Sequence, residues 1–238
     1  EALMATSNLS EVEKNQILKA ISTITKEGYR VLGVGFTEFP GTNYPKKQQD
    51  FEFAFLGLVA FYDPPKANIQ EVFETFYNAG IDIKIVTGDN AETTASIAKQ
   101  IGFRNTSKTL NGDELMLMDE DTLKQKVMET SIFTRMFPEA KLKIVEALKA
   151  NNQIVAMTGD GVNDGPALKS AHIGIAMGKK GTEIAKQAAN LILIDDDFSK
   201  MIDAIAMGRK IYTNLKKAIQ YIISIHIPII LIVFIPLA

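Results

Sequence analysis

The chain has 238 residues, of which 46% are hydrophobic and 23% charged, and its 26 basic and 28 acidic side chains give a net charge of −2. This is the composition of a folded protein with a sizeable core, and it excludes a peptide, a wholly disordered chain and a general binder of nucleic acid or other polyanions. The sequence contains no cysteine, which excludes disulfide frameworks, thiolate metal sites and cysteine nucleophiles, and its two histidines are His172 and His226.

The first residues do not resemble a targeting signal. The sequence starts with Glu1, and residues 1–10 lack the basic start and the apolar stretch of a signal peptide. We therefore expect the sequence to be an internal part of a longer protein.

The first clear structural pattern is a strand followed by a helix and a second strand. Residues 55–62 form a short apolar and aromatic run that predicts a strand, and Asp63 and the two prolines after it end that strand. In the next segment apolar side chains recur at helical spacing, and Gly80 marks the end of this helix before a strand over residues 81–86. These segments predict one βαβ unit.

A similar pattern follows later in the chain. Pro138 begins a helix, the asparagine pair at 151–152 ends it, and residues 154–157 form the next expected strand. Two further apolar runs, at residues 173–177 and 191–194, extend the expected sheet. Strands that alternate with helices are typical of α/β proteins with a parallel sheet, and this is the fold class that the sequence predicts.

Two of the expected strands end in the same short motif. The sequence TGDN, at residues 87–90, follows one strand, and TGDGVND, at residues 158–164, follows another. Open α/β sheets bind ligands at the carboxyl ends of their strands, glycine lets the backbone approach a phosphate, and aspartate oxygens suit Mg²⁺. Either loop alone is also typical of an ordinary turn. Two of them at the ends of successive strands predict a site for phosphate and Mg²⁺.

The last part of the chain has the composition of a membrane span. Residues 218–238 contain few polar side chains, and as a helix they would extend roughly 30 Å, close to the thickness of a bilayer core. Lys210, Lys216 and Lys217 precede the span, and basic flanking residues favour the cytoplasmic side. A buried core helix is the alternative, but such helices seldom run this long without a polar face. We therefore expect an integral membrane protein with residues 1–217 in the cytoplasm.

Six stretches match one known family in order and spacing. They are YDPPK at 62–66, TGDN at 87–90, FPEAK at 137–141, TGDGVNDGPAL at 158–168, GIAMGKKGTEIAKQAANLILIDDDFSKMIDAI at 174–205, and GRKIYTNLKKAIQYII at 208–223. Together they resemble the P-type ATPases, which are membrane ion pumps, and the match is closest to the calcium and sodium-potassium pumps. The resemblance implies a haloacid-dehalogenase-like Rossmannoid parallel sheet flanked by helices, followed by a stalk and a transmembrane helix.

The resemblance also implies roles for particular residues. Thr87 would hydrogen-bond the transferred phosphoryl group, Lys141 would neutralise its oxygens, and Asp160 would bind Mg²⁺. Asn163 and Asp164 would hold the phosphoryl and metal shell, with Asp164 as a second metal ligand. A lone lysine is ordinarily a solvated surface residue, but the place of Lys141 between the two loops favours the functional role. Positions that match the nucleotide side of the family's site are Arg30, Asp63, Gly88, Asp89 and Arg135.

The resemblance divides the chain into three expected parts. Residues 1–53 would be the end of a nucleotide-binding domain, 54–208 most of a phosphorylation domain, and 209–238 a stalk with the start of the fifth membrane helix. The family's phosphorylated aspartate lies in a DKTGT motif, and DKTGT occurs nowhere in these 238 residues. We therefore expect a fragment of a pump whose nucleophile lies upstream. Its expected partners are ATP, the transported cation, the lipid bilayer and the remaining domains of the same pump, with no nucleic acid.

An acidic run near the end of the sheet imitates a different nucleophile motif. The sequence LILIDDDFS, at residues 191–199, resembles the strand and aspartates of stand-alone phosphatases with a related fold. That motif should precede the threonine loop and the lysine, whereas this run follows both. We interpret Asp195, Asp196 and Asp197 as a charged cap on a strand end that leads into a helix at Phe198. The alternative function is a stand-alone phosphatase, or a pseudoenzyme that binds Mg²⁺ and nucleotide and regulates a partner.

The expected membrane helix differs from the family where ions bind. In calcium and sodium-potassium pumps this helix carries a glutamate ion ligand shortly after an asparagine, and the corresponding positions here are Ile229 and His226. The imidazole of His226 could bind a metal, relay protons or hydrogen-bond a neighbouring helix. Pro228 and Pro236 would kink or unwind the helix and free backbone carbonyls as ion ligands.

Overall fold

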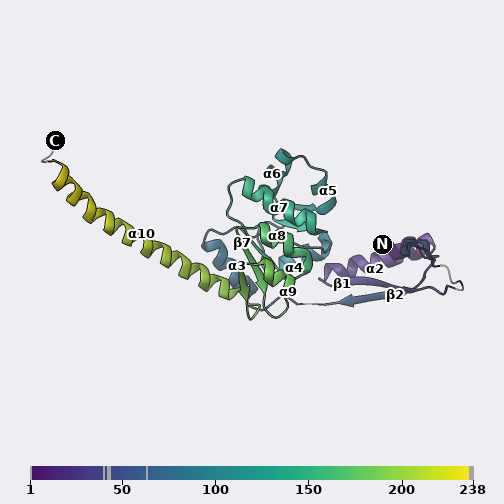
Figure 1. Cartoon of the computed structure of the whole chain (residues 1–238). Helices are drawn as coiled ribbons and strands as arrows, with labels where there is room; N and C mark the ends of the chain where they lie inside the picture. The colour runs from purple at the N-terminus through teal and green to yellow at the C-terminus, as the bar shows by residue number, and fades with distance from the viewer. Residues whose placement is uncertain (1, 40, 42–43, 63, 236–238) are drawn as a thin grey trace.

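The computed structural model describes residues 2–39, 41, 44–62 and 64–235. Figure 1 shows three parts in chain order: helices with a two-stranded ribbon near the N-terminus, an α/β part, and one long helix that projects away from it. The α/β fold class predicted from the sequence is confirmed, although one strand has a different partner from the one expected.

The N-terminal part is built on an antiparallel ribbon whose two strands pair along nearly their whole length. The helix before the ribbon begins at a capping box, in which Ser10 and Glu13 satisfy each other's backbone N–H groups. The elements of this part are α1 (Ala2–Ala5), α2 (Glu11–Lys26), β1 (Arg30–Phe36), the 3-10 turn η1 (Gln48–Asp50) and β2 (Ala54–Phe61).

The pairing of β2 shows that the first expected βαβ unit is wrong. The apolar run at residues 55–62 does form a strand, but it pairs antiparallel with β1 and not with the strand before the first TGD loop. Strand propensity reports how well side chains suit a pleated surface, and it carries no information about the partner. The partner is chosen by packing between residues that are far apart in the chain.

The α/β part contains two parallel sheets of three strands each. One sheet has the order β3-β5-β4 and the other the order β6-β7-β8. The strands are β3 (Ile85–Val86), β4 (Thr109–Asn111), β5 (Ile132–Thr134), β6 (Ala156–Gly159), β7 (Ile173–Met177) and β8 (Leu191–Leu193).

The bounds of the strands match those predicted from the sequence best for the two short apolar runs at 173–177 and 191–194. β7 has the expected bounds, and β8 ends one residue before the expected 194. β3 is shorter than expected because it pairs with β5 at only two positions, Ile85 with Ile132 and Val86 with Phe133. β6 is shifted toward the second TGD loop, since Thr158 and Gly159 are themselves paired with β7.

Helices connect these strands and cover the sheets (Figure 1). Gly80 follows the first of them with φ +73°, a conformation that glycine adopts without strain, and Pro138 opens the helix that contains Lys141, as predicted. The helices are α3 (Ile69–Asn78), α4 (Ala91–Gln100), α5 (Gly112–Met116), α6 (Glu120–Glu129), α7 (Pro138–Ala150), the 3-10 turn η2 (Val162–Asp164), α8 (Gly165–Ser170) and α9 (Glu183–Ala188).

The largest apolar core joins the first sheet to α6 and α7. Its centre is Phe133 of β5, a fully buried side chain in the same cluster as Leu115 and Val127. Burying a side chain of this size contributes about 1.5–3 kcal/mol relative to leaving it exposed. Because β5 lies between β3 and β4, this core also fixes the strand that carries the first TGD loop.

The chain ends in one helix of 36 residues, α10 (Ser199–Phe234). Within the described residues this is the one helix long and apolar enough to cross a membrane, with a mean hydropathy of 1.5 over its most apolar window, and that window is wholly exposed. The segment expected to begin a stalk at residue 209 lies inside this continuous helix. Pro228 also lies within it, and Nδ1 of His226 is 2.8 Å from the carbonyl oxygen of Ile222. Pro236 lies outside the described residues.

Candidate active site

The two TGD loops meet at the carboxyl ends of β3 and β6, where they line one cavity of about 300 Å³. Open α/β folds bind ligands at this edge of the sheet. The cavity brings together residues that are as far apart in the sequence as Thr87 and Asp164. Of the residues predicted for the site, the cavity wall contains Thr87, Gly88, Lys141, Asp160 and Asp164.

The first loop is held firmly at the end of β3. The Thr87 N–H donates to the carbonyl of Phe133 (2.9 Å), and the Met136 N–H donates to the carbonyl of Thr87 (2.9 Å). The Thr87 hydroxyl accepts from the N–H of Asp89 at 3.1 Å. Asn90 then caps α4 through the N–H of Thr93. The backbone N–H and carbonyl of Thr87 are thus both hydrogen-bonded, and they hold its side chain at the cavity.

A nearly buried ion pair joins α7 to the second loop. Nζ of Lys141 lies 2.7 Å from Oδ1 of Asp164, and the two side chains are 15% and 9% exposed. The other carboxylate oxygen, Oδ2, accepts from the N–H groups of Asp160 and Gly161, each at 3.2 Å. Hydrogen bonds to charged groups are stronger than neutral ones, and a buried charge requires such partners. Asp164 therefore fixes both the lysine and the shape of the loop.

The cavity presents a cation and a hydroxyl to any bound group. The ammonium of Lys141 has three donors, one of which bonds Asp164, and the Thr87 hydroxyl adds another polar contact. Charge-assisted hydrogen bonds from such donors stabilise the oxygens of a phosphoryl group. The arrangement can therefore hold a tetrahedral oxyanion between the two loops.

The carboxylates of the second loop suit a Mg²⁺ ion that keeps other ligands. Asp160 is exposed at the cavity, and Asp164 has about four acceptor positions on its two oxygens, three of which accept from Lys141 and the two loop N–H groups. Among the residues that the structure describes, no group of three or more His, Cys, Asp or Glu side chains gathers as a metal site. Mg²⁺ in phosphoryl-transfer sites is usually held by one or two carboxylates, with water and substrate phosphate as its other ligands. The pair present here fits that pattern.

The residues expected on the nucleotide side lie around the first loop. Nε of Arg30, at the start of β1, is 3.7 Å from Oδ1 of Asp89, which joins the N-terminal ribbon to the TGD loop. Both side chains are exposed, so the pair contributes at most about 1 kcal/mol to stability. Arg135 has φ +51°, and its N–H donates to the carbonyl of Asp89 at 2.9 Å. Asn163 has an exposed side chain and does not line the cavity, and Asp63 lies outside the described residues.

Some residues of the cavity wall were not singled out by the sequence analysis. Val86, Met157 and Met177 line it together with Thr158 and Gly159. The three apolar residues lie at or near the carboxyl ends of β3, β6 and β7. Val86 and Met157 are identified only by their position just before a TGD loop, and Met177 by its place in the matching stretch at 174–205.

Gly159 is required at the second loop because there is no room for a side chain. A Cβ atom at this position would lie 2.5 Å from Cβ and 2.8 Å from Cγ of Asp164. Asp164 cannot move away without breaking its bonds to Lys141 and the loop N–H groups. We expect Gly159→Ala to lower the free energy of unfolding by about 1–3 kcal/mol, the usual cost of overpacking.

The matched control for this change is Gly88→Ala in the first loop. A Cβ atom at Gly88 would lie 3.7 Å from the carbonyl oxygen of Met136, which is an ordinary contact. Urea unfolding of both variants in detergent micelles measures the difference. Equal stabilities of the two variants would contradict the close packing of Gly159 on Asp164.

The acidic run after β8 was predicted to form a charged cap, and of its three aspartates only Asp197 bonds the start of α10. Oδ1 of Asp197 accepts from the Ser199 N–H at 2.9 Å, at the start of α10, and from the side-chain amide of Asn68 at 3.4 Å. The hydrogen bonds from Ser199 lower the pKa of the Asp197 carboxyl below its ordinary value. Asp195 is exposed and pairs with Lys179 at 3.5 Å. None of the three aspartates at 195–197 lines the cavity between the TGD loops.

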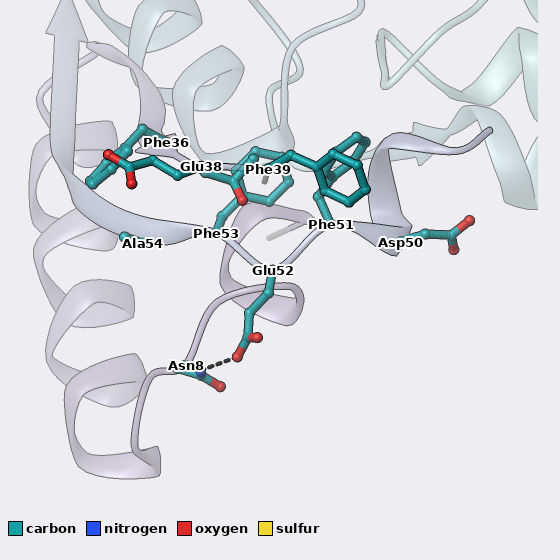
Figure 2. A pocket seen from close by; sticks show the side chains of 10 residues that line it. Asn8, Phe36, Glu38, Phe39, Asp50, Phe51, Glu52, Phe53 and Ala54 are labelled. Atoms are coloured by element: carbon teal, nitrogen blue, oxygen red, sulfur yellow. Dashed lines mark hydrogen bonds between the residues drawn. The ribbon is translucent and has the colours of Figure 1, made fainter. Parts of the chain in front are cut away.

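A larger hollow, of about 620 Å³, lies in the N-terminal part (Figure 2). It is bordered by aromatic rings and by carboxylates, and the side-chain amide of Asn8 donates to Glu52 at its edge. Carboxylates around an opening repel phosphate groups, so this hollow is unsuited to a nucleotide's polyphosphate. Its aromatic and acidic residues are Phe36, Phe39, Phe51, Phe53, Glu38, Asp50 and Glu52.

Comparison with known proteins identifies the family of this chain. Residues 20–172 match the haloacid dehalogenase-like hydrolases. The chain is 40% identical over 217 residues to Calcium-transporting ATPase 1 of Bacillus cereus, an alignment that covers 91% of this chain and 24% of that protein. It is 44% identical over 177 residues to human Calcium-transporting ATPase type 2C member 1, which covers 74% of this chain and 19% of that protein.

A third relative is the Probable cation-transporting ATPase F of Mycobacterium tuberculosis, which is 39% identical over 220 residues, 90% of this chain and 24% of that protein. The chain thus spans about a fifth to a quarter of the length of these relatives. It belongs to the haloacid dehalogenase-like hydrolases, and its relatives within them are calcium- and cation-transporting P-type ATPases.

Proposed function

We propose that this chain is the segment of an ATP-driven cation pump that binds Mg²⁺ and the transferred phosphoryl group while an aspartyl-phosphate forms and is hydrolysed. The observation that carries the proposal is the Lys141–Asp164 pair at a cavity lined by both TGD loops. The names of the relatives, which are calcium- and cation-transporting ATPases, support the same reaction. The transported cation is the cargo of the complete pump.

In this proposal the residues of the cavity divide the work of phosphoryl transfer. Lys141 and Thr87 hold the oxygens of the phosphoryl group from two sides, while Asp160 and Asp164 bind Mg²⁺. The ion, when bound, neutralises the charge that the phosphoryl oxygens share. Asp164 also keeps Lys141 in place through the bond at 2.7 Å. Asn163 is exposed on η2 and does not line the cavity, so its position does not support the role expected from the sequence.

The nucleotide approaches from the N-terminal ribbon. Arg30 and Asp89 face each other across the gap between the ribbon and the first loop, where Arg30 meets the ATP phosphates. Gly88 leaves the loop backbone open to a phosphate. Arg135, whose N–H bonds the carbonyl of Asp89, belongs to the same side of the site, to which the resemblance also assigns Asp63.

In this proposal the chain supplies three successive parts of the pump. Residues 1–53 end the nucleotide-binding domain, 54–208 form most of the phosphorylation domain, and 209–238 enter the membrane. Residues 1–217 are cytoplasmic, because the lysines before the apolar segment favour that side and because the site must meet cytoplasmic ATP. The bilayer and the other domains of the pump are then the partners of this segment.

A chimera tests the proposal. Residues 1–208 of this chain replace the matching segment of the Bacillus cereus Calcium-transporting ATPase 1, so that the membrane helices stay those of the relative. We expect the chimera to form an acid-stable, hydroxylamine-sensitive phosphoenzyme from radiolabelled ATP. A folded chimera that is delivered to the membrane and forms none would contradict the proposal.

The 238-residue chain by itself is expected to form no acyl-phosphate from ATP and to hydrolyse neither ATP nor p-nitrophenyl phosphate above background. The reason is that the sequence contains no DKTGT motif, and that Asp195, Asp196 and Asp197 do not line the cavity. The measurement is phosphate release with Mg²⁺, together with hydroxylamine treatment of the labelled protein. A hydroxylamine-sensitive adduct on Asp195 or Asp197 would support the alternative of a stand-alone phosphatase.

A further inference from the structure

Asp196 is buried and has an unusual backbone conformation. It is 7% exposed, and its φ is +55°, a region that few residues other than glycine adopt. Strained backbone of this kind persists only where surrounding contacts hold it. Asp196 lies between the exposed Asp195 and the helix-capping Asp197, but it has a different set of partners.

Both carboxylate oxygens of Asp196 bind a loop that is distant in sequence. Oδ1 accepts from the N–H of Lys179 and Oδ2 accepts from the N–H of Lys180, each at 3.0 Å. The backbone carbonyl of Asp196 accepts from Nζ of Lys66. Burial raises the pKa of the Asp196 carboxyl, but the N–H bonds outweigh this effect and hold the pKa below its ordinary value. The side chain is therefore a charged anchor for the loop.

The anchored loop, residues 178–182, joins β7 to α9 and packs closely on the end of β8. The Gly178 N–H donates to the carbonyl of Leu193 at 2.8 Å. A Cβ atom at Gly178 would lie 2.6 Å from Cα of Ile194, so the two backbones are in contact. The loop is thus bonded to the β8 end both by its own backbone and by the Asp196 carboxylate.

The same loop reaches the candidate active site at both of its ends. Met177, just before it, lines the cavity between the TGD loops. At its other end the Thr182 N–H donates to the backbone carbonyl of Asp160 at 2.8 Å, and the Thr182 hydroxyl caps α9. The position of the Asp160 peptide therefore depends on where residues 178–182 lie.

We propose that Asp196 is a positioning residue: its carboxylate holds residues 178–182, and this loop, through the Thr182 N–H, sets the position of the Mg²⁺ ligand Asp160. The proposal rests on the proposed function in one respect, that Asp160 binds the ion. It gives Asp196 a role different from that of Asp197, which bonds the start of α10.

Four versions of the 238-residue chain in detergent micelles test the proposal: the unchanged chain, Asp196→Asn, Asp195→Asn and Asp160→Asn. Asparagine keeps the size of Asp196 but removes the charge and one of the two acceptors. Asp195 is the matched control, because it is the neighbouring carboxylate and its side chain is 64% exposed. Mn²⁺ binding, followed by water proton relaxation with Mg²⁺ as competitor, reports on the metal site. Hydrogen exchange of peptides covering residues 178–186 reports on the loop without any metal.

We expect Asp196→Asn to weaken Mn²⁺ binding about tenfold, the lower range of what loss of an outer-shell partner costs, and to speed exchange at Thr182. Asp195→Asn should change neither reading. Asp160→Asn should remove ion binding but leave exchange at Thr182 unchanged, because the acceptor of that N–H is a backbone carbonyl. Thermal unfolding of each variant separates a local change at the loop from a general loss of stability.

The two possible failures are distinguishable. If Asp196→Asn matches Asp195→Asn in both readings, the positioning role is wrong, whatever the metal does. If Asp160→Asn binds Mn²⁺ as the unchanged chain does, the proposed metal site is wrong, and exchange at Thr182 still tests the link from Asp196 to the loop. Should Asp196→Asn not fold, Thr182→Pro removes the N–H that bonds the Asp160 carbonyl, at a φ of −69° that proline adopts, and must weaken Mn²⁺ binding; unchanged Mn²⁺ binding in that variant overturns the proposal.

Discussion

Replacement of Asp160 by asparagine in the pump chimera is expected to reduce phosphoenzyme formation at least about a thousandfold, the effect of losing several kcal/mol of charge stabilisation by Mg²⁺. Asp160 is an exposed carboxylate at the cavity, and asparagine supplies an oxygen without the charge. The measurement is the level of phosphoenzyme formed from radiolabelled ATP across a range of Mg²⁺ concentrations.

The control for this variant is Asp195→Asn in the same chimera. Asp195 is exposed, pairs with Lys179 and does not line the cavity, so phosphoenzyme formation should stay nearly unchanged. An equal loss in both variants, with the fold intact by circular dichroism, would contradict the assignment of Asp160 as the metal ligand.

Replacement of Lys141 by methionine is expected to destabilise the chain by about 3 kcal/mol, the lower end of the cost of breaking a buried ion pair. The change leaves Asp164 as a nearly buried carboxylate without its cation, although the two loop N–H groups still bond its other oxygen. The same substitution should also stop phosphoryl transfer in the chimera, because a donor to the phosphoryl oxygens is lost. Urea unfolding and phosphoenzyme levels measure the two effects separately.

Two further variants show whether loss of the Lys141–Asp164 ion pair causes the loss of stability. Lys108→Met removes a lysine that is 60% exposed and pairs with Glu129 at 3.4 Å, and it should change stability by less than about 1 kcal/mol. The double variant Lys141→Met, Asp164→Asn removes both charges and should recover part of the lost stability. A double variant no more stable than Lys141→Met alone would show that the buried charge is not the cause.

The parts of the site that could be predicted from the sequence are those encoded by short local patterns. The TGD loops follow apolar runs that do form parallel strands, one in each sheet, and ligands bind at the carboxyl ends of such strands. Pro138 set the start of α7 and therefore the place of Lys141 in its first turn. These signals involve neighbours in the chain, which is why they could be read without a structure.

Other features depend on contacts between distant residues and could not be predicted in this way. The partner of β2 is chosen by packing against β1, and no local pattern specifies it. Asp195 and Asp196 lie in the same local sequence, so the sequence does not tell them apart. Asp196 alone binds the N–H groups of residues 179 and 180, because the loop that contains them lies against the end of β8. The direct bond between Lys141 and Asp164 joins residues 23 positions apart.

The unbroken helix α10 has a mechanical consequence. Its 36 residues extend about 54 Å, of which a bilayer core requires only about 30 Å. Near its base the Arg209 guanidinium donates to the carbonyl of Ala79 at the end of α3, a contact that can act as a fulcrum. The 25 residues beyond Arg209 extend about 37 Å, so a pivot of about 8° at this contact moves the far end by about 5 Å, roughly one helical turn. Small changes of angle at the base of α10 are thereby amplified into displacements of its far end.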